Sequence, residues 1–303
     1  MNTGNELQSS AEISRNHASP DRMPMGFVFA TTGDEYTRLA RRTARNLRLA
    51  MPNAEIDLFT DQPIEDTVFN YVHPVAHDGK RPKMEALRNS RFDKTIYLDA
   101  DLVVLEDISD VFALLDCSPV VGVLGVSRLK SELNAYSNDI PRSFPVINSG
   151  LLGIRNGPRT RKFLRNWDES YASSGLDKDQ PVLRGVLYRS GINPLILPQE
   201  YNLIQHSMLS SWSNINGGLR GLHYRALHYI KHVDPTAPVS LREVLRRKEI
   251  QTLERARAAD FTLRDRQSPI YDLKPPKGQR PAHRVGQPGL LRRIKRAIFN
   301  RRR

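Results

Sequence analysis

The chain has 303 residues and a mass of 34.5 kDa, enough for one large domain or two modest ones with a buried core. Its net charge is +13 and its mean hydropathy is −0.51. Because it has no run of about 18 apolar residues and no apolar stretch near its start, we expect neither a membrane-spanning helix nor a secretory signal. Cys117, the single cysteine, excludes an intramolecular disulfide and a cysteine-based zinc site, and we expect a soluble cytoplasmic protein.

The positive charge is concentrated in one segment. Residues 274–303 contain eleven Lys and Arg and no Asp or Glu, so the rest of the chain is almost balanced. The high pI therefore suggests a nucleic-acid partner only for this tail, and we expect none for the body. Within the tail, 288–303 places apolar residues on one helical face among Arg and Lys, which is typical of peripheral contact with an anionic membrane. A solvated terminus is the alternative interpretation.

Short apolar runs alternate with helical patterns along the middle of the chain. Strands are predicted at 26–32, 56–61, 94–98, 120–124, 146–154, from 195 and over 222–231. One helix is predicted after the first strand, with Tyr36, Leu39, Ala40, Ala44 and Leu47 on one face. Further helices are predicted to begin at Pro82, to span 158–171, to begin near Asp177 and to span 241–266, the last as a charged surface helix.

This alternation predicts an α/β fold, a single domain with a mixed, mainly parallel sheet flanked by helices. We expect a disordered segment over 1–24, the α/β domain over 25–235, a helical extension over 236–272 and the basic tail over 273–303. In such sheets, ligands bind beyond the carboxyl ends of the strands.

Two carboxylates, Asp99 and Asp101, lie between the apolar runs 94–98 and 102–105. On a continued strand both would project to the same side. Two like charges so close together are costly unless a cation joins them. Oxygen ligands suit Mn²⁺ or Mg²⁺, which are often shared with substrate phosphates. We interpret the pair as a metal site; a polar turn between strands is the alternative.

The stretch 83–105, KMEALRNSRFDKTIYLDADLVVL, resembles the donor-site block of nucleotide-sugar glycosyltransferases with the GT-A fold. It is most similar to family 8, the glycogenin and lipopolysaccharide galactosyltransferase type, and the resemblance extends over about 27–234. It implies a GT-A, Rossmann-like domain, a Mn²⁺ or Mg²⁺ cofactor and a nucleotide diphosphate sugar donor, expected to be UDP-linked. It also implies retention of the anomeric configuration, and donor contacts from Lys83, Asp99, Ala100 and Asp101.

The first predicted strand and its turn resemble the family's segment for the nucleotide base and ribose. By that likeness the donor-binding candidates there are Ala30, Thr31, Thr32 and Tyr36. Core packing is the alternative for Tyr36. Asp61, at the end of the second strand, is a candidate for a base or ribose hydrogen bond, or for capping the turn that follows it.

Two later segments match the family in the same order. Asn148-Ser149-Gly150 resembles its sugar-pocket strand, with an edge-strand bulge as the alternative. Asp179 and Gln180 resemble its catalytic pair, in which the Asp binds sugar hydroxyls and the Gln lies near the anomeric carbon. A capping box from Asp177 to Gln180, and an Asp179 that favours the helix dipole, are the structural alternatives.

A His-rich segment, 223–232, follows the last of these blocks. The family's final metal ligand is a His, and a downstream Lys contacts the diphosphate, which points to His228 as the ligand and Lys231 as the diphosphate contact. The family's Gly and Lys-Pro-Trp ending are missing, so His223 and His232 stay open as substitutes for His228.

The sequence therefore predicts a metal-dependent hexosyltransferase that uses a UDP-sugar and an acceptor of glycan, lipid-linked or protein type. One rival is a sugar nucleotidyltransferase, although such enzymes need a Gly-rich phosphate loop and Gly33 is the single glycine of the first turn. The other rival is a non-enzymatic protein that binds a membrane or nucleic acid through its basic tail.

Overall fold

The computed structural model describes residues 23–75, 81–230, 233–263 and 266–276. Lys231, His232 and nearly all of the basic tail, including 288–303, lie outside the described residues, as do 1–22. The predictions for them stay predictions. In the described part, none of the helices combines the length and the apolar character needed to cross a bilayer.

Strand β1 (Met23–Thr31) shows how the sheet separates two hydrophobic clusters. Phe27 and Phe29 pack into one cluster, whereas Val28 and Ala30, which alternate with them, pack into the other. This period of two along the buried residues 26–31 predicts helices on both faces of the sheet. The predicted strands and helices are found in the predicted order. The described strands are β1, β2 (Ile56–Thr60), β3 (Tyr71–Pro74), β4 (Phe92–Leu98), β5 (Leu102–Val104), β6 (Val120–Leu124), β7 (Ile147–Arg155), β8 (Leu195–Leu197) and β9 (Gly221–His223).

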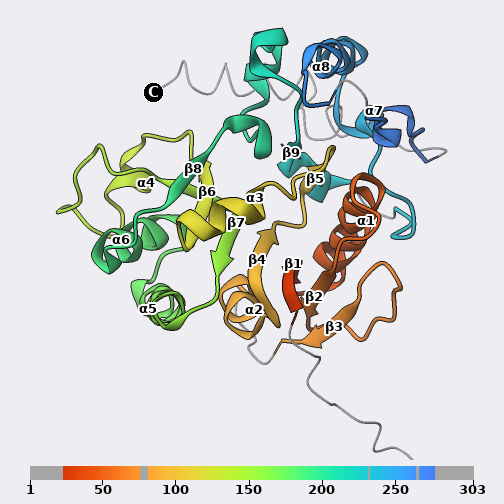
Figure 1. Cartoon of the computed structure of the whole chain (residues 1–303). Coiled ribbons are helices and arrows are strands. Elements are labelled where there is room, and N and C mark those ends of the chain that lie inside the picture. Colours follow the sequence, from red (N-terminus) through yellow and green to blue (C-terminus); the bar gives the residue numbers. More distant parts are fainter. Residues whose placement is uncertain (1–22, 76–80, 231–232, 264–265, 277–303) are drawn as a thin grey trace, which may run out of the picture.

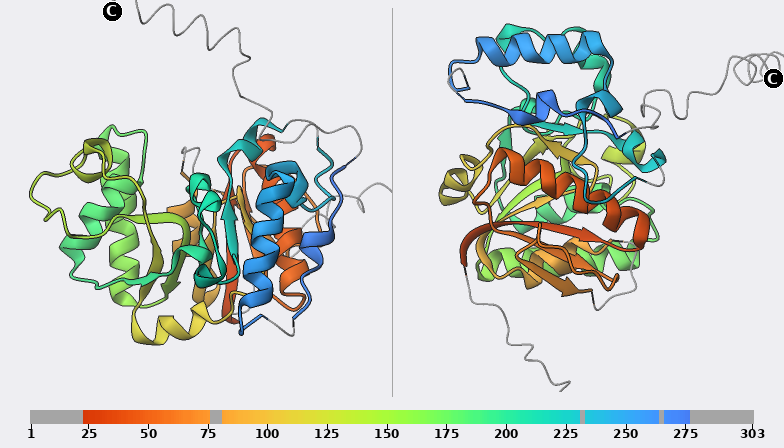
Figure 2. Two further views of the ribbon diagram at one scale, coloured as in Figure 1. Left: turned by 90° about the horizontal axis from the view of Figure 1, so that it is seen from above. Right: turned by 90° about the vertical axis from the view of Figure 1, so that its right-hand side faces the viewer.

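Helices cover both faces of the sheet (Figure 1). The helices α1, α3, α7 and α8 contribute to the cluster of Phe27, and α2, α5 and α6 contribute to the cluster of Val28. Figure 2 shows α5 and α6 at one end of the molecule and α1 with α8 at the other. The described α-helices are α1 (Asp34–Ala50), α2 (Lys83–Asn89), α3 (Val111–Cys117), α4 (Lys130–Leu133), α5 (Pro158–Ser174), α6 (Gln180–Ser190), α7 (Leu241–Val244) and α8 (Arg247–Ala259). The described 3-10 helices are η1 (Gln199–Tyr201), η2 (His206–Ser210), η3 (Asn214–Asn216), η4 (Arg225–Tyr229) and η5 (Pro269–Asp272).

The main sheet has seven strands in the order β3-β2-β1-β4-β7-β6-β8. Its pairs are parallel except those of β7, which runs antiparallel to both β4 and β6. The predicted α/β fold with a mixed, mainly parallel sheet flanked by helices is therefore confirmed. Because β7 runs opposite to its neighbours, the beginning of β7 lies at the same edge as the carboxyl ends of β1, β2 and β4. This edge carries most of the predicted site.

The structure corrects four local predictions. Strand β1 begins at Met23, two residues inside the segment expected to be disordered. Helix α6 begins at Gln180 with Asp179 as its N-cap, three residues after the predicted start at Asp177. The last strand ends at His223, and the chain then turns into η4. The charged segment predicted as one surface helix contains α7 and α8, and each of them buries an apolar face in the core.

The segment after the site is attached to α1 by buried polar groups. Arg42 of α1 donates to both carboxylate oxygens of Glu243, at 2.8 and 3.0 Å, and to the carbonyl of Ala237. Four residues further along α1, Asn46 exchanges two hydrogen bonds with the backbone of Val239. Buried charges require such complete pairing. Residues 237–243 are therefore fixed against α1, the helix that follows the first strand of the site.

Asp260, which follows α8, holds a loop that leads to β9. Its carboxylate accepts the N–H of Gly218 at 2.9 Å and lies 3.3 Å from the guanidinium of Arg220. Burial by itself would raise the pKa of Asp260, but hydrogen bonds from Thr262 and Gly218 outweigh it and lower the pKa to about 2. A carboxyl whose pKa is lower in the folded than in the unfolded chain stabilises the fold above its unfolded pKa, and loses this contribution as the pH falls through the folded pKa.

Replacing Asp260 with asparagine is therefore expected to lower the free energy of unfolding by about 2 kcal/mol at neutral pH. The difference from the parent protein will shrink as the pH falls from about 4 toward 2, because protonation then removes the same charge from the parent. Urea unfolding at a series of pH values measures this. Asp116→Asn, at an exposed ion pair with Lys94, is the control and should change little. A difference that is the same at every pH would contradict the assignment.

Candidate metal and donor site

The Asp-x-Asp motif lies in a tight turn and not on a continued strand. Strand β4 ends at Leu98 and β5 begins at Leu102, whose N–H donates to the carbonyl of Asp99 at 3.0 Å. The N–H of Asp99 donates to the carbonyl of Gly150 on β7, at 2.8 Å. The expectation of two carboxylates on one strand face is therefore corrected. The turn brings them together because it bends the chain between two buried apolar strands that belong to different sheets.

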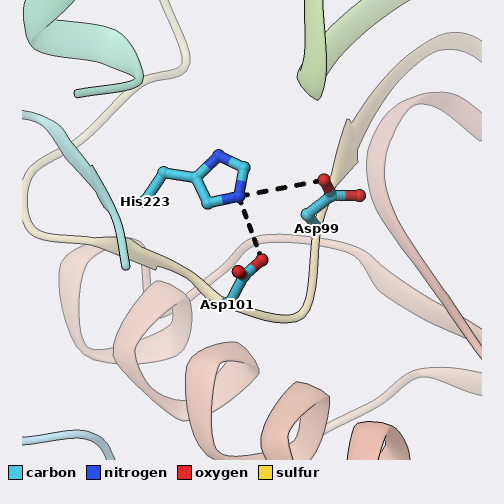
Figure 3. A group of neighbouring side chains, drawn as sticks. All are labelled: Asp99, Asp101 and His223. Atoms are coloured by element: carbon cyan, nitrogen blue, oxygen red, sulfur yellow. Dashed lines mark ion pairs between the residues drawn. The ribbon is translucent and has the colours of Figure 1, made fainter. Parts of the chain in front are cut away.

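His223 faces both carboxylates (Figure 3). Its Nε2 lies 3.1 Å from Oδ1 of Asp101 and 3.9 Å from Oδ2 of Asp99. Ligand atoms of these three residues all lie within 4.8 Å of one another, a spacing that suits a shared metal ion. The imidazole reaches this position because β9, which ends at His223, pairs antiparallel with β5 and places His223 opposite Leu102. Two carboxylates and one imidazole are donors that Mn²⁺ accepts.

His228, the histidine favoured from the sequence, also contacts the site. It lies on η4 and its Nε2 is 3.1 Å from Oδ2 of Asp101, the oxygen that His223 does not contact. The ring of Tyr36 lies against it, with ring centroids 4.7 Å apart. Tyr36 is 51% exposed and so does not join Leu39 on the buried face of α1, which corrects that prediction. A pocket of about 170 Å³ lies beside His228, against the first turns of α1.

The two histidines are in direct contact with Asp101. Burial by itself would raise the pKa of Asp101, but the charge and hydrogen bonds of His223 and His228 outweigh burial and hold that pKa well below its usual range. Burial likewise would lower the pKa of His223, but Asp101 and Asp99 raise it above its ordinary value. The charged forms of acid and base stabilise each other here. A divalent cation would replace the proton at Nε2 as the partner of the carboxylates.

Lys83 lies between the cluster of Asp99, Asp101 and His223 and the predicted sugar pocket. It opens α2 and is only 5% exposed, and its Nζ lies 3.2 Å from Oδ1 of Asp99, 2.9 Å from Oγ of Ser149 and 3.5 Å from Oδ2 of Asp179. Burial by itself would lower the pKa of Lys83, but Asp179 and Asp99 outweigh burial and raise it. The side chain therefore stays a cation, in contact with three residues predicted to bind the donor.

The predicted catalytic pair lies at the start of α6, facing β7. Asp179 is 5% exposed and accepts a hydrogen bond from Ser149 at 3.4 Å. Burial by itself would raise the pKa of Asp179, but the charges of Lys83 and Arg81 lower it, so it remains a carboxylate. The side chain of Gln180 accepts from Asn148 at 3.2 Å.

The residues expected around the nucleotide are arranged at the ends of β1 and β2. Ala30 and Thr31 are buried, and the Thr31 hydroxyl is bonded to that of Thr37 at 2.9 Å, whereas Thr32 is half-buried. Asp61 accepts the N–H of Gly33, at 2.8 Å, and so connects the two turns. Ala100 is buried in the Asp-x-Asp turn, and its carbonyl accepts from Thr43 of α1 at 3.1 Å.

Three residues that contact the candidate site were missed by the sequence analysis. The Tyr97 hydroxyl donates to Oδ1 of Asp99 at 2.8 Å, and burial with the neighbouring Asp99 raises the pKa of Tyr97 well above its ordinary value, so that it stays a donor. Its position two residues before Asp99 on a strand was a usable signal. Arg81 lies 3.7 Å from Asp179, and Asn202 contacts His223 and Asn148. For Arg81 and Asn202 the sequence offered no comparable pattern.

Gly150 leaves the space in which the His223 ring lies. A Cβ at this position would lie 2.4 Å from Cε1 of His223 and 2.6 Å from its Nδ1. We expect Gly150→Ala to displace the imidazole and weaken Mn²⁺ binding about tenfold or more, as measured by electron paramagnetic resonance of free Mn²⁺. Gly157→Ala is the matched control, because its Cβ would meet only Thr160, at 3.7 Å. A folded Gly150→Ala protein with unchanged affinity would contradict the role of His223.

Comparison with solved structures finds glycosyltransferases. The galactosyltransferase LgtC, in complex with donor and acceptor sugar analogues, is 16% identical over 66% of this chain and 87% of its own, with a TM-score of 0.49. Apo GlyE of Streptococcus pneumoniae TIGR4 is 16% identical over 78% of this chain and 60% of its own, with a TM-score of 0.49. Apo mouse xyloside xylosyltransferase 1 is 13% identical over 67% of this chain and 98% of its own, with a TM-score of 0.44.

No protein-family model and no curated protein sequence matches the chain. The solved structures belong to the class that the resemblance of residues 83–105 predicts. Since their identities are low and their TM-scores lie below 0.5, the function proposed next is argued from this chain's own residues.

Proposed function

We propose that the chain is a metal-dependent glycosyltransferase that moves a hexose from a UDP-sugar to an acceptor, with retention of the anomeric configuration. The observation that carries this proposal is a juxtaposition at one sheet edge. The three-residue cluster of Asp99, Asp101 and His223 adjoins the buried cluster of Lys83, Ser149 and Asp179 through a shared residue, Asp99. A metal-binding group beside a cation and sugar-binding side chains is what a nucleotide diphosphate sugar requires.

The donor set fits a hard divalent ion. Oδ2 of Asp99, the carboxylate of Asp101 and Nε2 of His223 are the ligands we assign, because Oδ1 of Asp99 already accepts from Lys83 and Tyr97. Oxygen-rich sites with one imidazole favour Mn²⁺, and Mg²⁺ is the alternative. When bound, such an ion neutralises charge that develops on the leaving diphosphate.

The remaining residues have distinct proposed tasks. Lys83 supplies a permanent positive charge toward the diphosphate, and the exposed part of Arg81 supplies a second one. Asp179 stays ionised and can accept hydrogen bonds from sugar hydroxyls, while Gln180 and Asn148 offer amides at the same place. The nucleotide is assigned to the turn from Ala30 to Thr32, with Tyr36 and Asp61 as further candidates, and to the Asp-x-Asp turn with Ala100. Gly150 is assigned to the sugar pocket, together with Asn148 and Ser149.

The acceptor is proposed only by class, as a glycan, a lipid-linked saccharide or a protein. The predicted diphosphate contact of Lys231, the cytoplasmic location and the membrane contact of 288–303 stay predictions from the sequence.

A panel of nucleotide diphosphate sugars tests the proposal. The full chain is incubated with each donor and Mn²⁺, and release of the nucleoside diphosphate is followed with and without chelator. Slow hydrolysis by water makes the test possible without a known acceptor. We expect turnover of at least one UDP-sugar that stops on chelation and resumes with Mn²⁺. Turnover that is insensitive to chelation, or the absence of turnover and of binding for every donor, would refute the proposal.

A further inference from the structure

A chain of side-chain amides connects the two halves of the site. Asn202, at the end of η1, is 1% exposed and lies between His223 and Asn148. Its Nδ2 donates to Oδ1 of Asn148 at 2.9 Å, and its Oδ1 lies 3.0 Å from Nδ1 of His223. Nδ2 of Asn148 in turn donates to Oε1 of Gln180 at 3.2 Å, and Nε2 of Gln180 donates to Oε2 of Glu132 at 3.4 Å.

The direction of every hydrogen bond in this row of side-chain amides follows from one backbone group. The N–H of Gly150 donates to Asn148 at 2.9 Å, and since a backbone N–H can only donate, the atom of Asn148 that it meets is the oxygen. The same oxygen faces Asn202, so Asn202 must present its NH₂ group there. Its carbonyl oxygen therefore faces His223, and Nδ1 of His223 must carry the proton that this oxygen accepts.

We infer that Asn202 is a positioning residue that holds His223 as the Nδ1–H tautomer and turns the lone pair of Nε2 toward the proposed metal position beside Asp99 and Asp101. This inference rests on the proposed metal site and deepens it. A metal-binding histidine is normally oriented by an acceptor on its other ring nitrogen, usually a carboxylate, a backbone carbonyl or water. Here the acceptor is the neutral amide of Asn202. The NH₂ group of the same amide donates to Asn148, on the strand of the predicted sugar pocket.

The backbone around Asn202 supports this assignment. The next residue, Leu203, accepts from the N–H of His223 at 3.1 Å and donates to the carbonyl of Gly221 at 2.9 Å. The segment therefore runs alongside β9, and Asn202 cannot move away from the imidazole without breaking these bonds. An amide held this rigidly loses little entropy when it orients the ring.

Two substitutions at Asn202 separate orientation from packing. Asn202→Leu is similar in size but makes no hydrogen bond, and we expect Mn²⁺ affinity, measured by electron paramagnetic resonance without nucleotide, to fall about 10- to 100-fold. Asn202→Asp still accepts from Nδ1–H but cannot donate to Asn148, and its Mn²⁺ affinity should stay within about threefold of the parent. Unchanged affinity in Asn202→Leu, or an equal loss in both variants, would overturn the inference.

A matched control and a direct observation complete the test. Asn46→Leu removes another fully buried amide, which bonds the backbone of Val239. It should lower the melting temperature without changing Mn²⁺ affinity. If the Asn202 variants fail to fold, the long-range ¹H–¹⁵N spectrum of the Mg²⁺-loaded parent decides, with the His223 signals assigned from His223→Gln. A proton on Nδ1 is expected, and a proton on Nε2 would overturn the inference.

The proposed function and this inference fail in different ways. If the parent protein binds no Mn²⁺, the proposed metal site is wrong. The inference about Asn202 rests on that site and is then overturned as well. If Mn²⁺ binds and the Asn202 variants behave as predicted but no sugar nucleotide is turned over, the positioning role stands and the proposed reaction fails.

Discussion

Replacing Asp101 with asparagine is expected to abolish tight binding of Mn²⁺ and to lower sugar transfer about a thousandfold. Asp101 contacts both histidines of the site through its two oxygens, at 3.1 Å each, and is 6% exposed. Residues that merely orient a metal ligand are worth about 10- to 100-fold in affinity, so the loss of a ligand should cost about a hundredfold or more. Loss of charge stabilisation at the leaving group accounts for the rest of the decrease.

The matched control for this substitution is Asp107→Asn. Asp107 follows β5 on the chain, and its carboxylate caps the N–H of Ser109 and faces Arg266 at 3.5 Å, outside the metal cluster. It should retain both Mn²⁺ affinity and turnover. Titration of each variant with Mn²⁺, followed by a turnover assay at saturating metal, separates binding from chemistry. An Asp101→Asn protein that binds Mn²⁺ like the parent would show that the carboxylates serve only the fold.

Lys83→Met has the second largest expected effect, because it removes the cation from a cluster of buried acids. Asp99 and Asp179 would then face each other without the ammonium group that now lies 3.2 and 3.5 Å away. Removing one partner of a buried ion pair typically costs about 3 to 5 kcal/mol. We also expect turnover to fall about 100- to 1000-fold, because the positive charge toward the diphosphate is lost. Thermal unfolding and turnover with saturating Mn²⁺ measure the two effects.

Lys94→Met is a suitable control for Lys83→Met. Lys94 also forms an ion pair, with Asp116 at 2.8 Å, but that carboxylate is 63% exposed. Exposed pairs contribute about 0 to 1 kcal/mol, so the control should unfold close to the parent and keep its turnover. If Lys83→Met matched the control in both measurements, the proposed link between the metal cluster and the sugar pocket would be wrong.

The sequence predicted the parts of the site that depend on local pattern. The apolar run 94–98 followed by Asp99 identified a strand end, and Lys83 lay at the start of a helix as expected. These features follow from period-two burial and from helix-start signals, which the chain displays locally. The sheet then brings strand ends together, which is why Asn148 and Asp179 lie near the carboxylates although they are far apart in the chain.

The histidine arrangement could not be predicted in the same way. His223 and His228 both follow apolar residues, and the difference between them depends on where the last strand ends. That end is set by the pairing of β9 with β5 across the Asp-x-Asp turn, a long-range contact with no local signal. The role of Asn202 depends on the same contact. The choice between the two histidines therefore depends on a place where several elements meet, for which local sequence patterns carry no information.

A site that binds a divalent metal and a nucleoside diphosphate together is tested most directly by calorimetric titration of the full chain with UDP. The titration is run with Mn²⁺ and again with chelator. We predict saturable binding of one UDP per chain with Mn²⁺, and a loss of affinity of about tenfold or more with chelator. Equal affinity under both conditions, or no binding of UDP under either, would contradict the account.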